Sequence, residues 1–494
     1  MNSINRYDTF QWKLICPEWL QLTVEKTAAL FGLQPGGATT DCYLFVLEAQ
    51  DKGRGASLVS FSVYDYRGTL LAEHVLPCES TLKTTGKHTA ALVVLQTLHT
   101  LLPDIPLPPW GVLQGIRPGK LATRLLAAGK KADEAIASLM DHYSVSHAKA
   151  MLAVEIAVRQ QPLLAVLSEP RSVSVYISVP FCPSRCLYCS FPSAVRPGAK
   201  QVKTFLQAVG HDLAAVVKLL TRFNLSVKTV YIGGGTPTVL TDEEFDWLLN
   251  QVGPLLSART AEFTVEAGRP DTFSLHKLAA MAAQGVTRIS LNPQTMQDRT
   301  LRLIGRAHTA QDVRNQMKEV RRIGIASVNM DLIAGLPGET VPMFQDTLEQ
   351  TLAFAPENLT VHTLALKRRS PLFALGEAVL ASSETVAQMV DLSLQETARS
   401  GWHPYYLYRQ HYITGNLENV GYAKAGFESL YNVQMMEEWQ TVIGAGPSAV
   451  TKLVLSPGRR MDHYFMPKDS DYYAASIERL VCAREALLTP LYGV

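Results

Sequence analysis

The sequence lacks three features that would place a chain in a broad functional class. It has no excess of one charge, because 46 lysine and arginine residues nearly balance 44 aspartate and glutamate residues, for a net charge of +2. A near-neutral chain suits extended nucleic-acid backbones poorly, so we expect no nucleic-acid partner. It has no run of about 18 uninterrupted apolar residues, so we expect no membrane span. Residues 1–6 also lack the basic-then-apolar order of a signal peptide, which predicts a cytoplasmic protein.

Cysteine is scarce too, with seven residues among 494, which excludes a disulfide-stabilised fold. Three of the seven, Cys182, Cys186 and Cys189, fall within eight positions. In a reducing compartment such a cluster indicates metal ligands. Structural zinc sites and ordinary [4Fe–4S] sites use four protein ligands, and no further cysteine or Cys/His pair lies nearby. Three thiolates would leave one iron of a cluster open to a substrate. Buried structural cysteines or adventitious zinc are the alternatives.

The chain is too long for one compact core, and its patterning predicts three domains. Residues 1–170 are expected to form an N-terminal α+β domain, with a hairpin from Cys42–Glu48 and Ala56–Tyr66 and helices from His88 onward. Residues 171–372 form the expected core. Residues 373–494 are expected to form a C-terminal domain that covers the substrate.

The expected core alternates short apolar runs with helical stretches, which predicts βα units and a parallel sheet. The six expected strands are Val173–Val179, Val227–Ile232, Glu262–Glu266, Thr287–Asn292, Ser327–Ile333 and Leu359–Leu366. Six units are too few for a closed eight-fold barrel, so the expected fold class is α/β with an open, partial (β/α)6 barrel. Its reactive groups should lie at the C-terminal ends of the strands.

Polar and glycine-rich segments follow the expected strands at that edge. Tyr231–Thr238 contains three consecutive glycines, which let the backbone approach a ligand closely, although a tight turn would also explain them. Glu266 ends the third strand, where a plain surface carboxylate is the alternative. Gln294 and Arg306 follow the fourth strand and offer an amide and a planar cation suited to a carboxylate. Asp331, in the fifth strand, can accept hydrogen bonds from ribose hydroxyls.

These motifs, in this order, resemble the radical S-adenosylmethionine (SAM) superfamily. The resemblance implies that Cys182, Cys186 and Cys189 hold a [4Fe–4S] cluster whose open iron binds the amino and carboxylate groups of SAM. One electron then cleaves SAM into methionine and a 5′-deoxyadenosyl radical, which removes a hydrogen atom from the substrate. A flavodoxin or ferredoxin is the expected electron donor. The implied SAM contacts are Tyr176, Gly234, Gly235, Thr236, Glu266, Gln294, Arg306 and Asp331.

Within the superfamily, the chain is similar to the oxygen-independent coproporphyrinogen III oxidase-like family, and to its HemZ-type branch. For the family, the similarity is carried by Tyr176, Gln294, Arg306, Asp331, Tyr408–Gln410, Gly415–Tyr422 and Ile443–Ser448. For the branch, it is carried by Trp110–Lys120 and Ser290–Met296. The similarity covers about residues 105 to 465. It implies a tetrapyrrole substrate and an oxidoreductase of haem biosynthesis that oxidatively decarboxylates porphyrinogen propionates.

Two departures leave other functions open. Phe191 stands where the decarboxylases of the family have a fourth cysteine, and Ser178 stands where they have a histidine. The alternatives are radical chemistry on haem itself, such as methylation with ring opening, and a haem-binding or trafficking role. For the decarboxylase, the candidate partners of the propionates are Arg117, Lys120, Lys367, Arg368, Arg369 and Arg409. The candidates for stacking on the macrocycle are Tyr405, Tyr406 and Tyr408.

Overall fold

The computed structural model describes residues 11–33, 42–51, 57–78, 82–113, 117–367, 370–375, 380–410, 413–458 and 460–493. Contacts divide the chain into two compact units. Unit 1 comprises Met1–Gly115 and Gly129–Leu152, and unit 2 comprises Ile116–Ala128 and Ala153–Val494. The division into domains at residues 170 and 372 stays a prediction. By contacts, the residues expected in the core and in the C-terminal domain belong to the same unit.

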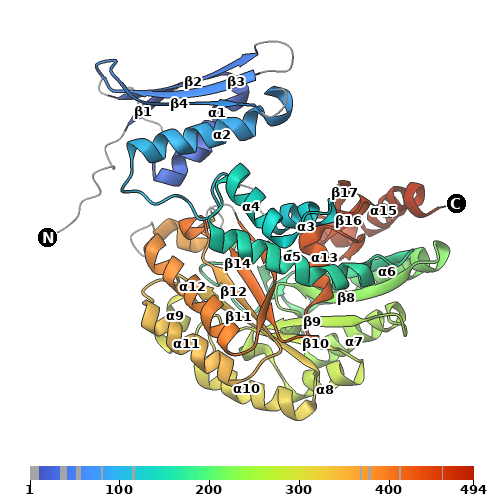
Figure 1. Ribbon diagram of the computed structural model, residues 1–494. Helices are drawn as coiled ribbons and strands as arrows, with labels where there is room; N and C mark the ends of the chain where they lie inside the picture. Colours follow the sequence, from blue (N-terminus) through green and yellow to red (C-terminus); the bar gives the residue numbers. More distant parts are fainter. Residues whose placement is uncertain are drawn as a thin grey trace. The chain divides into compact units, whose positions relative to one another are not determined.

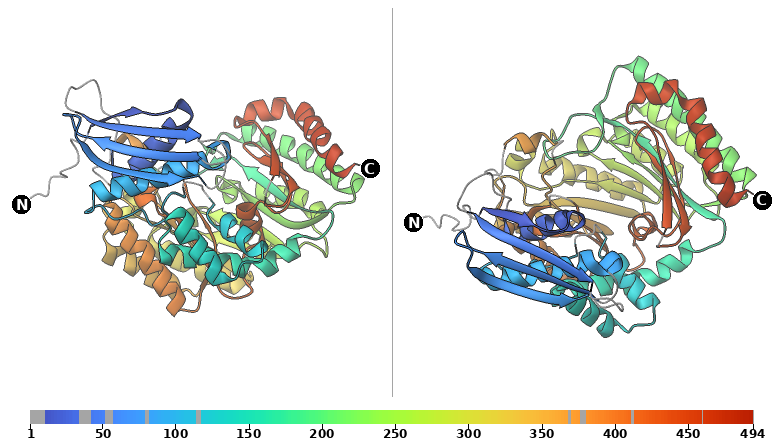
Figure 2. Two further views of the ribbon diagram at one scale, coloured as in Figure 1. Left: turned by 45° about the horizontal axis from the view of Figure 1, so that its top comes forward. Right: turned by 90° about the horizontal axis from the view of Figure 1, so that it is seen from above.

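Unit 1 is a four-stranded sheet with helices α1 and α2 on one face (Figures 1 and 2). Its elements are β1 (Trp12–Ile15), α1 (Glu18–Ala28), β2 (Tyr43–Asp51), β3 (Ser57–Tyr64), β4 (Leu70–Pro77), α2 (Leu82–Leu101) and α4 (Ala132–Tyr143). β1 and β2 are parallel, and the other neighbours are antiparallel. Trp12 stacks on Phe45 with ring centroids 4.7 Å apart, and Phe45 meets Phe61 edge-on at 5.3 Å. The expected hairpin is confirmed as β2–β3, while residues 52–56 lie outside the described chain.

Unit 2 is built on an eleven-stranded sheet in the order β13-β14-β12-β11-β10-β9-β8-β5-β15-β16-β17. All six expected strands are present as β5 (Ser172–Val179), β8 (Ser226–Gly234), β9 (Glu262–Gly268), β10 (Arg288–Leu291), β11 (Ser327–Ala334) and β12 (Asn358–Thr363). They are parallel to one another, which confirms the partial barrel. Their Val- and Ile-rich sequences fit strands that are covered on both faces.

Helices connect the parallel strands and lie outside the sheet (Figures 1 and 2). They are α6 (Ala199–Arg222), α7 (Asp242–Val252), α8 (Leu275–Ala283), α9 (Asp298–Leu303), α10 (Ala310–Ile323), α11 (Val341–Ala353) and α12 (Ser383–Arg399). Local sequence sets several of their ends. Thr241 and Glu244 form a capping box at the start of α7, and Gly324, with φ 85°, ends α10 in the left-handed conformation.

The C-terminal strands extend the barrel sheet at both edges. They are β13 (His403–Tyr408) and β14 (Asn419–Ala423) beside β12, and β15 (Val442–Ala445), β16 (Val450–Ser456) and β17 (Arg460–Phe465) beside β5. β15 is parallel to β5, so seven parallel strands form the barrel wall. An open six-stranded sheet would leave backbone groups unpaired at both edges, and these strands satisfy them.

Helix α13 (Leu430–Glu437) lies at the N-terminal ends of the strands. Glu262, the first residue of β9, accepts hydrogen bonds from the backbone N–H groups of Leu430 at 2.9 Å and Tyr431 at 3.2 Å. The Ser429 hydroxyl donates to the same carboxylate at 2.9 Å. A carboxylate at a helix N-terminus is stabilised by the unpaired N–H groups there. The cysteine loop lies at the opposite edge, because it follows the C-terminal end of β5.

Helix α5 (His147–Leu167) is the one helix of the described chain that is long and apolar enough to cross a membrane. Half of its most apolar window, 50%, is buried within the protein. Gln160 also donates a hydrogen bond to the carbonyl of Tyr405 at 2.8 Å. Core helices of globular proteins pass the same test of length and composition, so α5 is weak evidence for a span. The cytoplasmic location stays a prediction.

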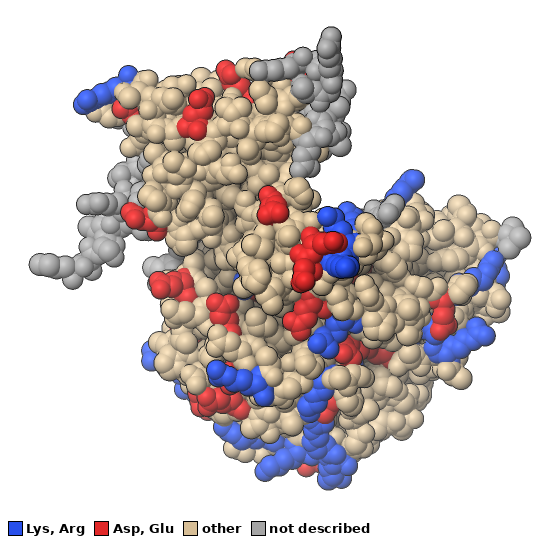
Figure 3. Space-filling view, in the orientation of Figure 1, with Lys and Arg blue, Asp and Glu red and all other residues tan. Residues whose placement is uncertain are grey.

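Charged side chains of both signs are mixed on the face of unit 2 in Figure 3. One ion pair differs from these surface charges, because Asp212 of α6 and Arg484 of α15 (Ile477–Tyr492) are fully buried, with 2.6 Å between Oδ1 and Nη2. The Tyr473 hydroxyl donates to Asp212 at 2.5 Å, and the backbone N–H of Gly446 does so at 3.1 Å. This network attaches the C-terminal helices to the loop that follows β15.

We therefore expect Arg484→Met to destabilise unit 2, because it leaves the Asp212 carboxylate buried without its cation. The cost should be about 3–5 kcal/mol of unfolding free energy, measured by urea denaturation. The matched control is Arg222→Met, because Arg222 pairs with Glu485 between the same two helices at the surface. That change should cost at most about 1 kcal/mol. Equal effects of the two substitutions would contradict the role of the buried pair.

Candidate active site

The C-terminal ends of the parallel strands surround a cavity of about 210 Å³, and all three clustered cysteines line it. Seven of the eight residues that the sequence assigns to SAM line it as well: Gly234, Gly235, Thr236, Glu266, Gln294, Arg306 and Asp331. These residues are separated by up to 149 positions from the cysteines, and the parallel sheet brings them to one place. Their roles as ligands stay predictions.

The cysteine loop is held by backbone hydrogen bonds to other segments. β6 (Phe181–Cys182) pairs in parallel with β7 (Ala194–Val195), so the two ends of the loop are joined. The N–H of Leu187 donates to the carbonyl of Ile304 at 3.0 Å. Cys189 donates to the carbonyl of Cys186 at 3.1 Å, which makes a tight turn between these two cysteines. The loop is therefore held at its ends by the β6–β7 pairing and in its middle by the contact between Leu187 and Ile304.

The donor set fits a cluster better than a single metal ion. Among the described residues, no group of three or more His, Cys, Asp or Glu side chains is placed to hold one metal ion. In a [4Fe–4S] cluster each thiolate binds a different iron, so the three sulfur atoms surround a space and do not converge on a point. Cys182, Cys186 and Cys189 would hold the cluster from one wall of the cavity, and the polar residues of the strand ends face it across the same cavity.

The three glycines at the end of β8 let this segment lie directly against the cysteine loop. A Cβ atom on Gly235 would come within 2.4 Å of the Phe181 carbonyl oxygen and 3.0 Å of the Cys182 sulfur. Gly234 has φ 111°, a conformation that side chains disfavour. The hydroxyl of Thr236 lies 3.7 Å from the Cys182 sulfur. The glycines are thus required for packing as well as for opening the cavity.

Two carboxyl groups, Glu266 of β9 and Asp331 of β11, face the cavity together. Removal from bulk water, and then the nearby Asp331, raise the pKa of Glu266 to about 8. Hydrogen bonds from the Gly234 N–H and from Tyr231 oppose this shift. Asp331 accepts a hydrogen bond from the amide of Asn329 at 2.7 Å. The pair provides acceptors for the hydroxyl or ammonium groups of a ligand.

Gln294 and Arg306 are held in place by their backbone and side-chain partners. Gln294 adopts φ 69°, and its N–H donates to the carbonyl of Asp331 at 2.9 Å, which turns the chain across the end of β11. Its side-chain oxygen is buried and has no hydrogen-bond partner among the described residues. Arg306 donates to the carbonyl of Asn292 at 2.7 Å and to the hydroxyl of Tyr188 at 3.0 Å.

Tyr176 is the one predicted SAM contact that does not line this cavity. It stacks instead on Tyr231 and Tyr431, with ring centroids 6.0 and 6.2 Å away. Tyr231 and Tyr431 are themselves stacked at 4.4 Å. Removal from water and the nearby Glu266 raise the pKa of Tyr176. These rings fill the barrel between α13 and the cavity, so Tyr176 supports the floor of the site.

Sequence reasoning missed several residues that line the cavity, among them Tyr188, Arg269 and Asn292. Tyr188 precedes Cys189, so its place beside a metal ligand was a usable signal. Arg269 follows Glu266 by three positions, yet only the left-handed Gly268, with φ 56°, turns it back toward the cysteine loop. No pattern in the sequence shows that turn.

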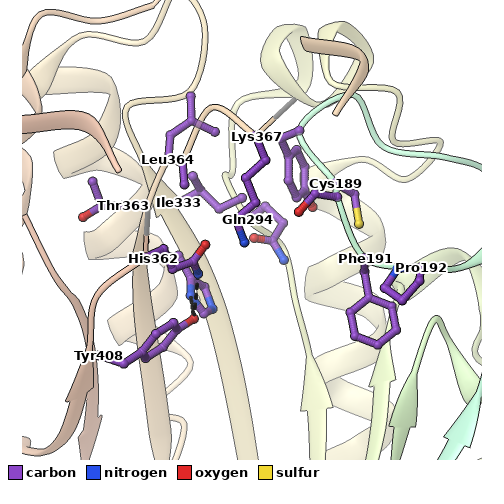
Figure 4. A pocket seen from close by; sticks show the side chains of 14 residues that line it. Cys189, Phe191, Pro192, Gln294, Ile333, His362, Thr363, Leu364, Lys367 and Tyr408 are labelled. Atoms are coloured by element: carbon purple, nitrogen blue, oxygen red, sulfur yellow. Dashed lines mark hydrogen bonds between the residues drawn. The ribbon is translucent and has the colours of Figure 1, made fainter. Parts of the chain in front are cut away.

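A second cavity of about 490 Å³ adjoins the first and shares Tyr188, Cys189, Phe191 and Gln294 with it. Figure 4 shows Cys189, Phe191 and Pro192 on one side of this second cavity, and His362 and Tyr408 on the opposite side. Its other lining residues include Ile333, Thr363, Leu364, Lys367 and Gln410. A molecule in the second cavity would therefore lie next to one bound at the cysteine loop.

One wall of the second cavity carries a hydrogen-bonded series of polar groups. The Tyr408 hydroxyl lies 3.1 Å from Nδ1 of His362, whose Nε2 is 3.6 Å from Asp331. Gln410 donates to the same hydroxyl at 3.3 Å. Lys367 also reaches this cavity, and removal from water lowers its pKa. These groups can bind or exchange protons with a polar part of a substrate.

Of the described residues expected to bind propionates or to stack on the macrocycle, only some line the second cavity. Of the cations expected to bind propionates, Lys367 lines the second cavity, whereas Arg117 and Lys120 pair with Glu438. Arg409 is buried and donates to the carbonyl of Asn416 at 3.0 Å. Residues 368 and 369 lie outside the described chain. Among the aromatic candidates, Tyr408 lines the cavity, and Tyr405 and Tyr406 belong to a buried core cluster.

The chain is similar to a known superfamily model and to curated proteins with haem-related names. Residues 176–351 match the model of the radical SAM superfamily. The chain is 40% identical over 399 residues to the oxygen-independent coproporphyrinogen-III oxidase-like protein HemZ of Bacillus subtilis, covering 79% of each chain. It is 31% identical over 265 residues to the heme chaperone HemW of the same organism, covering 53% of this chain and 66% of that one.

Among solved structures, the chain is similar in fold to the coproporphyrinogen III oxidase HemN of Escherichia coli, a radical SAM enzyme. The TM-score is 0.52 at 20% sequence identity, with 67% of this chain and 78% of that chain covered. At this identity the likeness concerns the fold.

The ligand assignment predicts the effect of cysteine substitutions. Cys182→Ala, Cys186→Ala and Cys189→Ala should each remove most of the iron and sulfide from anaerobically reconstituted protein, because three thiolates are the minimum set here. Cys482→Ala is the matched control, since Cys482 is exposed and does not line the cavity, and it should bind iron as the wild type does. Full cluster content in any of the first three variants would refute the assignment.

The raised pKa of Glu266 predicts a pH dependence of SAM binding. Below pH about 8 the carboxyl is increasingly protonated and loses acceptor capacity, so SAM affinity should fall up to about tenfold per pH unit. Above pH about 8 this contribution should level off. The dissociation constant measured across this range by equilibrium dialysis tests the prediction. In Glu266→Gln the pH dependence of the SAM dissociation constant should be smaller, because only the amino group of SAM still changes its protonation state. A pH dependence equal to that of the wild type would contradict the prediction.

Proposed function

This chain belongs to the radical SAM superfamily and, within it, to the family of HemZ- and HemN-like proteins, and we propose that it oxidatively decarboxylates a propionate of a porphyrinogen. The observation that carries the proposal is the pair of adjoining cavities. The first is lined by the cluster cysteines and by the predicted SAM contacts, and the second opens beside it through shared walls. A substrate in the second cavity lies against the place where the radical forms.

The lining of the second cavity suits one edge of a tetrapyrrole. Phe191, Ile333 and Leu364 provide apolar surface, and the volume lies within the range of pockets for small-molecule ligands. Lys367 provides an ammonium group for a carboxylate, and His362 provides an imidazole N–H for a second polar contact. Phe191, which replaces the fourth cysteine of the decarboxylases, is 41% exposed and so offers its ring to a ligand.

When bound, the cluster and SAM supply a radical that removes one hydrogen atom from the substrate. In the proposed reaction a propionate becomes a vinyl group with loss of carbon dioxide, one proton and two electrons. One of these electrons leaves with the hydrogen atom, and a one-electron acceptor takes the other. Lys367 would hold the carboxylate until it leaves, and Tyr188 and Gln294, which line both cavities, would keep the reacting carbon beside SAM. An external flavodoxin or ferredoxin would reduce the cluster.

Haem binding is the second candidate function, and the similarity to proteins named heme chaperone favours it. In that case His362, on the wall of the second cavity, would bind the haem iron in exchange for its contact with Tyr408 or Asp331. Radical chemistry on haem, such as methylation with ring opening, would use the same two cavities. The three functions differ in what happens to the tetrapyrrole, so they can be separated by mass.

The experiment is anaerobic incubation of reconstituted protein with SAM, dithionite and either coproporphyrinogen III or haem. A product lighter by carbon dioxide and two hydrogen atoms, formed with 5′-deoxyadenosine, supports the decarboxylase. Deoxyadenosine without any change of coproporphyrinogen rejects it. A methylated or opened macrocycle from haem shows the radical alternative. Stoichiometric haem binding with no SAM cleavage shows the carrier role.

Lys367→Met should raise the KM for the porphyrinogen about tenfold, because one charge-assisted hydrogen bond to a carboxylate is lost from a partly buried site. Lys367→Arg should retain most of the affinity, since it keeps the positive charge. SAM cleavage without substrate, measured as 5′-deoxyadenosine, should be the same in all three proteins. An unchanged KM in Lys367→Met would show that the carboxylate binds elsewhere.

A further inference from the structure

Arg269 makes a direct hydrogen bond to one of the three cluster cysteines. Its Nη1 lies 3.4 Å from the sulfur of Cys186, and only 3% of the residue is exposed. Its Nη2 donates to the hydroxyl of Ser184 on the same loop at 3.2 Å. The guanidinium group thus bridges the end of β9 and the cysteine loop at two points.

Asp271 fixes the orientation of this guanidinium group. Its carboxylate accepts hydrogen bonds from Nε of Arg269 at 2.9 Å and from Nη2 at 2.8 Å, a bidentate arrangement that leaves Nη1 aimed at the sulfur. The backbone also contributes, because Gly268, with φ 56°, turns the chain at the end of β9. The side chain therefore has one orientation, set by a partner two residues away.

We propose that Arg269 raises the reduction potential of the cluster through its hydrogen bond to the Cys186 thiolate. This inference rests on the assignment of the cluster to the three cysteines and does not depend on the substrate. Reduction of [4Fe–4S] adds one negative charge, which spreads onto the sulfur ligands. A fixed cation that donates a hydrogen bond to a ligand sulfur stabilises the reduced form more than the oxidised form, and burial strengthens that effect.

The other buried cation of the site, Arg306, acts on the cysteines through its charge and makes no such hydrogen bond in the described structure. Arg306 donates from Nη1 to the carbonyl of Asn292 and from Nη2 to the hydroxyl of Tyr188. In the described structure its nitrogen atoms make no hydrogen bond to a cysteine sulfur. Both arginines line the cavity, but among the described residues Arg269 is the one that acts on the cluster through a hydrogen bond to a ligand sulfur.

The experiment compares the cluster midpoint potentials of the wild type, Arg269→Gln and Arg269→Lys by dithionite titration followed by electron paramagnetic resonance. In Arg269→Gln, which lacks the charge, the ratio of reduced to oxidised cluster at a fixed potential should fall about tenfold. That change equals a midpoint about 59 mV lower for a one-electron couple. Arg269→Lys keeps a positive charge but lacks the planar guanidinium group that Asp271 orients, so its midpoint should fall by less. The midpoint does not depend on how much protein carries a cluster, so partial loading leaves this readout intact.

Ser184→Ala is the matched control, because it removes the other hydrogen bond between Arg269 and the cysteine loop without touching the thiolate. Its midpoint should equal that of the wild type. Equal midpoints in the wild type and both Arg269 variants would overturn the proposal and show that Arg269 only supports the loop. Wild-type protein with no cluster would overturn the cofactor assignment itself, and a wild-type cluster with no tetrapyrrole turnover would affect only the proposed function.

Discussion

The site depends on one geometric constraint, the common direction of the barrel strands. Because β5, β8, β9, β10, β11 and β12 are parallel, their C-terminal ends meet at one edge, and residues from distant parts of the sequence face a single cavity. Glu262 places α13 at the opposite edge, and the stacked Tyr176, Tyr231 and Tyr431 fill the space between. The three cysteines can therefore present a cluster to polar groups that no local segment could supply.

The sequence predicted those parts of the fold and site that depend on local patterns. Apolar runs between helical stretches located all six barrel strands, and the spacing of Cys182, Cys186 and Cys189 indicated the cluster. Positions fixed by tertiary contacts could not be predicted in this way. The strands after residue 400 pair with the free edges of the sheet, and no pattern in their sequence showed that pairing. Arg269 reaches Cys186 only through the turn at Gly268.

The two adjoining cavities have different linings. The smaller one is lined by the three clustered cysteines and by seven of the predicted SAM contacts, while the larger one combines apolar walls with Lys367 and His362. Phe191 lines both cavities at the position of the missing fourth cysteine, so this departure lies on their shared wall and leaves the three thiols in place. Arg269 lines the smaller cavity, where its hydrogen bond to Cys186 links the geometry at the end of β9 to the ease of cluster reduction.

The central claim is that three thiolates hold a [4Fe–4S] cluster and leave one iron open to SAM. The most direct measurement is the Mössbauer spectrum of iron-labelled, anaerobically reconstituted protein with and without SAM. A cluster held by three thiolates should give a cubane spectrum in which one of the four iron sites differs from the others and changes its isomer shift when SAM is added. A protein that forms no cubane, or a cubane whose spectrum is the same with and without SAM, would contradict it.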